Sequence, residues 1–241
     1  MSSAAVYEPK GKAGEYADLA CNIYRGCAHG CTYCYAPTAL RMDRAEFADP
    51  QPRYGVVQQL KREAWKHRGR EIFFCFTCDP YQPIERSFRL MPMVIDACHR
   101  WGITVTILSK GGVNAMDDFS LLARHPELVD FGQTLTFITP DDSEKWEPKA
   151  SSPAERMYAL EQAKRAGFRT WASLEPVIDP EQTLDLIRQT HVYVDRYAVG
   201  KWNHDERAEA IDWKSFGKRA IELLEGYGKA FYIKHDLRIL L

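Results

Sequence analysis

The chain has 241 residues, of which 45% are apolar and 12% aromatic, and this composition excludes a disordered, collagen-like or low-complexity protein. Its 32 Lys and Arg residues against 33 Asp and Glu leave a formal net charge of −1, which excludes a surface covered in positive charge. A local basic groove stays compatible with this balance, because phosphate binding needs local rather than net charge. We expect a cytoplasmic protein with neither a signal peptide nor a membrane span, since no apolar run approaches the ~18–20 residues that a span needs.

Short β-rich runs alternate with helical periodicity along most of the chain. We expect strands at residues 18–24, 72–77, 103–108, 134–138, 168–174 and 192–199, with a last β-like run at 230–233. Apolar residues at helical spacing predict helices at 56–65, 93–101, 117–123, 153–166, 180–189 and 213–225. The fourth of these helices has the signature of a capping box, with Ser152 before Pro153 and Glu155 three residues after the serine.

This alternation predicts βαβ units and a parallel sheet. Crossovers in such units are right-handed, so six of them wrap progressively into an open or closed barrel. We therefore expect one α/β domain over residues 1–241, with a partial (βα)6 TIM-like barrel at about 15–200 and a helix-and-strand extension at 201–241. A doubly wound open sheet is the structural alternative, because periodicity alone cannot order the strands. A barrel would place its chemistry on loops at the carboxyl ends of the strands.

Three cysteines follow the first expected strand at CxxxCxxC spacing, in the loop 22–37 (NIYRGCAHGCTYCYAP). Clustered cysteines in a chain without a secretion signal favour metal binding or catalysis over a disulfide framework. Thiols at this spacing, Cys27, Cys31 and Cys34, can hold an iron–sulfur cluster and leave one iron open to a small-molecule ligand. The alternative is a zinc site with His29 as the fourth ligand.

The cysteine loop resembles the cluster loop of the radical S-adenosylmethionine (SAM) superfamily. Together with the runs CDPYQPIE at 78–85, LSK at 108–110 and WEPK at 146–149, it is similar to the spore-photoproduct-lyase-like branch. The resemblance implies a partial (βα)6 barrel of the radical SAM type and a [4Fe-4S] cluster on the three cysteines. It also implies that SAM is cleaved to a 5′-deoxyadenosyl radical, which abstracts a hydrogen from the substrate.

The resemblance further implies which side chains surround the cofactor. Tyr33 and Tyr35 flank the third cysteine, where the family places residues near SAM and the substrate radical, and both are catalytic candidates. Five side chains at or near expected strand ends are candidates to hold SAM beside these tyrosines: Thr77, Asp79, Lys110, Thr134 and Glu175. Each candidate also has a plainer interpretation, such as a packed tyrosine ring, a solvated lysine in a turn or a surface carboxylate.

The second expected strand departs from the family pattern. Spore photoproduct lyases carry a hydrogen-donating cysteine in a Cys-Thr-Ser-Asp stretch, and the equivalent residues here read Phe76-Thr77-Cys78-Asp79. Cys75 and Cys78 therefore flank a phenylalanine at the donor position. Alternation along a strand places these two thiols on opposite faces, so Cys78 reaches the lumen only where the strand ends. Cys78 is kept as a catalytic candidate.

The branch that the chain resembles acts on thymine in DNA, which suggests a nucleic-acid substrate. Arg25 and His29 in the cysteine loop are candidates to contact it, as are Lys201, Trp202 and His204 after the sixth strand, because an aromatic ring beside a cation can stack on a nucleobase. A basic cluster at residues 61–70 fits either phosphate contact or a solvated helix face.

Three functions stay open on the sequence. The first is modification or isomerisation of a thymine-derived base in DNA, such as the amino-acid-substituted thymine of the hypermodified DNA that some phages make. The second is a thymine-lesion lyase that returns the hydrogen through Cys78 or the tyrosines. The third is a non-catalytic, zinc-stabilised nucleic-acid-binding module. Either enzyme would need a reducing electron donor such as flavodoxin or ferredoxin.

Overall fold

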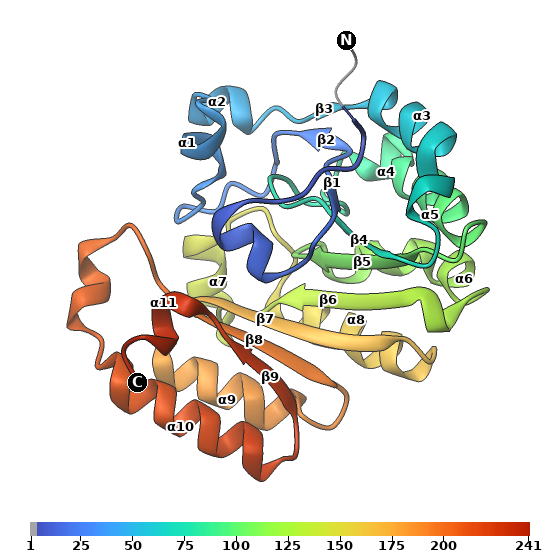
Figure 1. Cartoon of the computed structure of the whole chain (residues 1–241). Helices are drawn as coiled ribbons and strands as arrows, with labels where there is room; N and C mark the ends of the chain where they lie inside the picture. Colours follow the sequence, from blue (N-terminus) through green and yellow to red (C-terminus); the bar gives the residue numbers. More distant parts are fainter. Residues whose placement is uncertain (1–3) are drawn as a thin grey trace.

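A single parallel sheet organises the computed structural model, which describes residues 4–241 (Figure 1). Its seven strands run in the order β1 (Ala20–Cys21), β4 (Glu71–Phe74), β5 (Thr104–Ser109), β6 (Val129–Thr134), β7 (Arg169–Val177), β8 (Arg196–Lys201) and β9 (Ala230–Ile233). The spatial order follows the chain order, whereas a doubly wound sheet reverses direction at a switch point. The expected partial barrel is therefore confirmed, and β9 extends it at the edge beyond β8.

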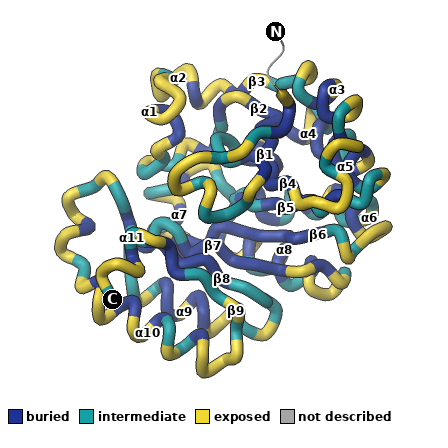
Figure 2. The backbone as a smooth tube through the Cα atoms, viewed as in Figure 1, coloured by how far each residue is buried: buried dark blue, intermediate teal, exposed yellow. Residues whose placement is uncertain are grey.

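Helices that link successive strands pack against the sheet, and Figure 2 shows buried strands beside helices with exposed outer surfaces. The longer helices are α3 (Tyr54–Glu63), α5 (Leu90–His99), α8 (Pro153–Arg165), α9 (Pro180–Thr190) and α10 (Trp213–Gly226). The shorter α-helices are α1 (Ala36–Leu40), α2 (Arg44–Phe47), α4 (Glu85–Phe88), α6 (Phe119–Leu122), α7 (Pro140–Trp146) and α11 (His235–Arg238). The 3-10 turns are η1 (Gly11–Glu15), η2 (Ala64–His67), η3 (Gly112–Asp118), η4 (Pro126–Leu128) and η5 (Glu206–Ala210). Within residues 4–241, none of the helices has the length and apolar content to cross a membrane.

Local signals set the helix boundaries where the sequence is explicit. The capping box at the start of α8 is confirmed, because the Ser152 hydroxyl accepts from the Glu155 N–H and the Glu155 carboxylate accepts from the Ser152 N–H. Asp179 caps α9 in a similar way, with its carboxylate accepting from two N–H groups of the first turn. Because β6 and β7 are parallel, the chain segments that lead from them to α8 and α9 start at the same edge of the sheet.

Two strand predictions are wrong in position. The strand expected at 134–138 lies at Val129–Thr134, where Asp130, Gly132 and Gln133 interrupt the apolar pattern although all six residues are buried. The first expected strand, 18–24, is split: only Ala20–Cys21 joins the sheet. The next strand, β2 (Tyr24–Arg25), pairs antiparallel with β3 (Gln51–Pro52) and so directs the chain into the cysteine loop.

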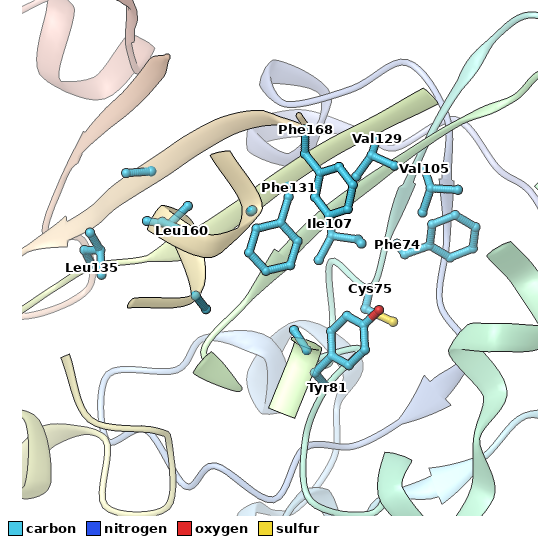
Figure 3. Packing of buried hydrophobic residues seen from close by; sticks show 14 of the residues in the cluster. Phe74, Cys75, Tyr81, Val105, Ile107, Val129, Phe131, Leu135, Leu160 and Phe168 are labelled. Atoms are coloured by element: carbon cyan, nitrogen blue, oxygen red, sulfur yellow. The ribbon is translucent and has the colours of Figure 1, made fainter. Parts of the chain in front are cut away.

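The apolar core has two parts, one on each face of the sheet. The larger part lies between strands and helices and includes Phe74, Ile107 and Phe131, which pack together in Figure 3. The smaller part fills the inner face with Phe73, Trp171 and their neighbours. This second cluster is the floor on which the candidate site is built.

Gly132 on β6 leaves the space that the Trp171 ring occupies. A Cβ at this glycine would lie 2.4 Å from Trp171 Cε2, so we expect Gly132→Ala to lower the free energy of unfolding by about 1–3 kcal/mol through overpacking. The matched control is Gly55→Ala in α3, where a Cβ meets nothing within 4 Å. The control should instead raise stability by up to about 1 kcal/mol, because alanine is the better helix former. Urea denaturation of both variants checks this difference, and equal effects would contradict it.

Candidate active site

A cavity of about 590 Å³ opens where the strands end and the loops begin. Nearly all the residues expected from the sequence line it: Cys27, His29, Cys31, Tyr33, Cys34, Tyr35, Thr77, Cys78, Asp79, Lys110, Thr134, Glu175, Lys201, Trp202 and His204. Arg25 is not among the lining residues within 4–241; it is exposed, and its Nη2 lies 3.1 Å from Glu46 Oε1. The basic cluster at 61–70 also lies elsewhere, in α3, in η2 and just before the amino end of β4.

Glycine turns and backbone contacts shape the cysteine loop. Gly26 has φ +88°, and a Cβ there would meet the Phe47 carbonyl oxygen at 2.6 Å, so this position requires glycine. The Cys27 N–H donates to the same carbonyl at 2.8 Å. From α2, the Arg44 guanidinium donates to the carbonyls of Thr32 and Cys34 at 3.2 and 3.1 Å. These contacts hold the loop so that three thiols face one cavity.

The three thiols form a sulfur-rich wall that suits an iron–sulfur cluster. Burial raises the pKa of Cys27, and it raises that of Cys31 to about 12 although the Lys110 ammonium lowers it. Thiolates are the ligands that such a cluster needs, so binding it must remove these protons. Arg156 is a second cation close enough to Cys31 to lower its pKa, though by less than Lys110 does.

His29 and Asp79 form a buried pair that joins the cysteine loop to the loop after β4. His29 Nε2 lies 3.1 Å from Asp79 Oδ2, and His29 Nδ1 lies 3.1 Å from the Lys149 carbonyl oxygen. Asp79 also accepts from Ser109 Oγ at 2.7 Å and from the Lys110 N–H at 2.6 Å. Burial alone would raise the Asp79 pKa, but His29 and these hydrogen bonds lower it to about 2. Both side chains thus link the loops that form the cavity wall. The expected contacts of His29 with the substrate and of Asp79 with SAM stay predictions.

Tyr33 is fixed by a buried ion pair that the sequence did not assign. Its hydroxyl donates to Glu147 and lies 3.2 Å from Thr136 Oγ1. Glu147 and Arg156 are each 1% exposed, and Glu147 Oε2 lies 2.6 Å from Arg156 Nη2. Lys110 Nζ is 3.9 Å from Glu147 Oε1 and 5.6 Å from the Tyr33 ring centre. The Tyr33 hydroxyl is therefore buried and bonded, whereas Tyr35 is 52% exposed on the rim.

Glu175 is held at the end of β7 by residues from both ends of the chain. The Tyr16 hydroxyl donates to Glu175 Oε2 at 2.5 Å and lies 3.1 Å from Ser173 Oγ. Lys234 Nζ is 3.9 Å from the same carboxylate oxygen and 3.9 Å from the Tyr16 ring centre. Tyr16 and Lys234 belong to none of the motifs in the sequence, so only the folded chain brings them into the cavity.

The chain after β4 corrects the expected alternation of faces. The strand ends at Phe74, and Cys75 has φ +72°, which breaks the period-two pattern. As a result every residue from Cys75 to Asp79 lines the cavity. The expected alternation of Cys75 and Cys78 between opposite faces is therefore wrong, whereas Cys78 reaches the cavity beyond the end of the strand, as expected. Phe76 stacks on Phe73, with ring centres 3.9 Å apart and planes at 2°.

The loop after β8 closes another part of the wall. Trp202 is 5% exposed and meets Trp146 edge to face, with ring centres 5.4 Å apart. The Arg207 guanidinium lies 4.8 Å from the Trp146 ring centre and 4.9 Å from that of Trp202. Lys201 Nζ lies 5.5 Å from the ring centre of Trp213. Trp202 is thus a packed wall residue whose face is already in contact with Arg207.

The family model described as the radical SAM superfamily matches residues 21–194 of this chain. The chain belongs to the radical SAM superfamily. Members of this superfamily use a [4Fe-4S] cluster and SAM, and these are the cofactors of this protein. The matched region contains the cysteine loop and five of the seven sheet strands in whole or part, and it ends before β8 and β9.

Curated relatives match about two thirds of this chain. An uncharacterized protein of Mycobacterium tuberculosis is 27% identical over 168 residues, which cover 65% of this chain and 48% of that protein. One of Methanocaldococcus jannaschii is 25% identical over 165 residues, covering 65% and 59%. This chain thus spans about half the length of these curated relatives.

Solved structures with the same fold include a radical SAM lyase. A mutant spore photoproduct lyase with bound AdoMet and dinucleoside spore photoproduct superposes with a TM-score of 0.68 and 14% identity, over 91% of this chain and 76% of that one. SuiB of Streptococcus suis, bound to S-adenosylmethionine, gives a TM-score of 0.64 and 13% identity, over 88% and 49%. At these identities the likeness shows the fold alone.

Membership in the radical SAM superfamily replaces the zinc-stabilised module considered from the sequence. His29, the fourth ligand in that alternative, instead directs one ring nitrogen to Lys149 and the other to Asp79. The cysteine loop therefore offers three thiols to a cluster, while both ring nitrogens of His29 already contact other residues of the protein.

Glu85 gives this radical SAM protein a testable pH dependence. The side chain is 2% exposed, and burial raises its pKa to about 7, although hydrogen bonds from Tyr24 and the Met91 N–H lower it. Between the ordinary value of 4.5 and 7 the folded protein holds a proton that the unfolded chain has lost, so stability falls as pH rises through this window. We expect Glu85→Gln to remove a slope of up to about 1.4 kcal/mol per pH unit, measured by urea unfolding across the window. Parallel pH profiles of variant and wild type would contradict this.

Proposed function

We propose that this enzyme abstracts a hydrogen from a thymine-derived base in DNA and that the outcome is modification or isomerisation, for example of an amino-acid-substituted thymine. When bound, the cluster and SAM supply a 5′-deoxyadenosyl radical. The observation that carries the choice is Phe76, which lines the cavity at the position of the lyase donor cysteine. A phenyl ring has no readily transferred hydrogen, so a rearrangement that needs no donor fits this wall better than a lyase reaction.

The lining of the cavity offers an apolar wall for a nucleobase and cationic side chains for the neighbouring phosphates. The rings of Phe73 and Phe76 lie with that of Tyr16, each 6.0 Å from it, and form an apolar wall. Lys10 and Lys201 also line the cavity and supply cations for phosphates. A base in duplex DNA would have to flip out to enter such a recessed site. The bound dinucleoside lesion in the spore photoproduct lyase structure supports the same class of substrate.

The polar side chains of the cavity would then hold SAM. Lys110 provides a positive point charge for the SAM carboxylate, and Glu175 provides acceptors for its amine or ribose. Thr77 and Thr134 add hydroxyl groups at the ends of β4 and β6. Tyr33, held by Glu147, keeps a fixed position beside the third thiol. We place the reaction in the cytoplasm, with flavodoxin or ferredoxin as the electron donor.

Isotope transfer tests the proposal. The reconstituted, reduced protein is incubated with SAM and duplex DNA that carries an amino-acid-substituted thymine deuterated at the substituent carbon. We expect 5′-deoxyadenosine to be released only with this DNA and to contain deuterium. A new nucleoside should form at the same time, with the mass of the substrate nucleoside after isomerisation and a different mass after modification. Equal release with unmodified DNA, without deuterium transfer, would overturn the proposed substrate.

A thymine-lesion lyase is the second candidate, and Cys78 is the observation that favours it. Cys78 lines the cavity and lies close enough to Cys27 for their charges to interact. The reconstituted protein is given a dinucleoside lesion in heavy water, where a donating thiol would deliver deuterium to the repaired thymine. Loss of this deuterium in Cys78→Ala, with SAM cleavage retained, would support the lyase. Absence of repair in the wild type would exclude it.

A further inference from the structure

Lys234 is a buried cation of the cavity wall to which the proposed function gives no role. It follows directly after β9, is 2% exposed and lines the cavity. Burying an ammonium group costs free energy unless opposite charges and hydrogen-bond acceptors surround it. The groups around Lys234 therefore indicate what its charge stabilises.

Three oxygen atoms and one aromatic ring surround the Lys234 ammonium. Nζ donates to the Lys12 carbonyl oxygen at 2.9 Å and lies 3.7 Å from Glu15 Oε1 and 3.9 Å from Glu175 Oε2. The ring centre of Tyr16 lies 3.9 Å from the same nitrogen, which is within the range of a cation–π interaction. Lys234 thus joins the N-terminal part of the chain to β7.

The N-terminal part of the chain is fixed at the same place by contacts with β9 and the residues that follow it. Glu15 Oε2 accepts from the Tyr232 hydroxyl at 3.0 Å and from the His235 N–H at 2.8 Å. All three residues lie outside the region 21–194 that the family model matches. The wall beside Glu175 is therefore built by the parts of this chain that the family model does not cover.

These contacts leave one oxygen of Glu175 for a ligand. Glu175 Oε2 accepts from the Tyr16 hydroxyl at 2.5 Å, whereas Oε1 accepts no hydrogen bond from the described residues 4–241. Gly200 on β8 leaves the space for this side chain, because a Cβ there would lie 2.6 Å from Glu175 Cδ. Glu175 lines the cavity, so its second oxygen can accept from a bound molecule.

The group of SAM that fits this oxygen is a ribose hydroxyl. The Lys234 ammonium already compensates the charge of Glu175, so a second cation, such as the SAM amine, would be repelled at this place. A hydroxyl group is neutral and donates without that repulsion, and a carboxylate is a known acceptor for a ribose hydroxyl.

We propose that Lys234 is a positioning residue for SAM, which fixes the Glu175 carboxylate so that it accepts from a ribose hydroxyl. The proposal rests on the contact between Glu175 and SAM proposed above. Without the ammonium, the carboxylates of Glu15 and Glu175 would be left around one space with no cation between them. Their repulsion would move Glu175 away from its position.

The affinity for SAM tests this role in the absence of DNA. Calorimetric titration of the cluster-loaded, unreduced protein gives the Kd for SAM and for an analogue of SAM that lacks both ribose hydroxyls. Lys234→Gln keeps a donor for the Lys12 carbonyl but removes the charge. We expect this variant to bind SAM about tenfold more weakly, the loss of one hydrogen bond to a charged group. Its affinity for the analogue should equal that of the wild type, because the analogue has no hydroxyl to offer Glu175.

Three further variants complete the test. Lys218→Met removes an exposed lysine of α10 and should bind SAM like the wild type. Lys234→Met is a second neutral variant of the same position, and melting curves and iron content show which variants are folded and loaded. Glu175→Ala should weaken SAM binding and leave analogue binding unchanged.

The outcomes separate this proposal from the proposed function. If Glu175→Ala weakens SAM binding and the folded Lys234 variants do not, Lys234 is not a positioning residue. An equal loss of affinity for SAM and for the analogue in the Lys234 variants would also overturn the proposal, since it would show a general disturbance of the cavity. Unchanged SAM binding in Glu175→Ala would overturn the contact between Glu175 and SAM itself. None of these results bears on the DNA substrate, which the isotope-transfer experiment tests.

Discussion

Replacing Cys27, Cys31 or Cys34 by serine is expected to remove the cluster and, with it, all release of 5′-deoxyadenosine. Each of these thiols lines the cavity and is one of the three candidate ligands of the cluster, and a serine hydroxyl is a hard, neutral substitute for a soft thiolate. Iron content should fall from about four per chain to near zero after reconstitution, and the brown colour should be lost. Iron and sulfide analysis, visible absorbance and chromatography of the SAM products measure these effects.

The matched control for this series is Cys98→Ala, which removes a fully buried thiol of α5 that lies outside the cavity lining. This variant should load iron and cleave SAM like the wild type, with only a loss of stability from the altered packing. A serine variant of the cysteine loop that kept its iron and its activity would contradict the assignment of that cysteine as a ligand.

The sheet was predictable because its signals are local. Alternation of β-rich runs with helical spacing gives parallel strands in chain order, and the Ser152–Glu155 capping box marks the start of α8 directly. The strand β6 was misplaced for a physical reason. Asp130 is buried in it because Arg196 from β8 neutralises it, with Arg196 Nη2 2.8 Å from Asp130 Oδ2. A local pattern of apolar residues cannot reveal an ion-pair partner that lies 66 residues away in the sequence.

The candidate site shows the same division between local and tertiary signals. The three candidate cysteine ligands and the tyrosines beside them belong to one loop, so spacing and resemblance were enough to single them out, and all five line one cavity. Glu147 was within a run singled out for its resemblance, yet its pairing with Arg156 depends on how α7 and α8 pack. Tyr16 and Lys234 come from the two ends of the chain, where the sequence carries no motif.

The buried pair of Glu147 and Arg156 predicts a large loss of stability when one partner is removed. In Glu147→Gln, Arg156 keeps its charge at 1% exposure but loses the carboxylate 2.6 Å away. We expect the free energy of unfolding to fall by about 3–5 kcal/mol, since an uncompensated charge is left in the interior. Urea denaturation of the apoprotein measures this change without requiring a substrate.

Two further variants show whether the loss comes from the buried charge. Glu46→Gln removes the exposed pair with Arg25 and should cost less than about 1 kcal/mol, because solvent screens that pair. Adding Arg156→Met to Glu147→Gln should restore much of the lost stability, since the double variant no longer buries a guanidinium without its carboxylate. If Glu147→Gln cost no more than Glu46→Gln, the unpaired charge of Arg156 would not destabilise the interior, and the prediction would be wrong.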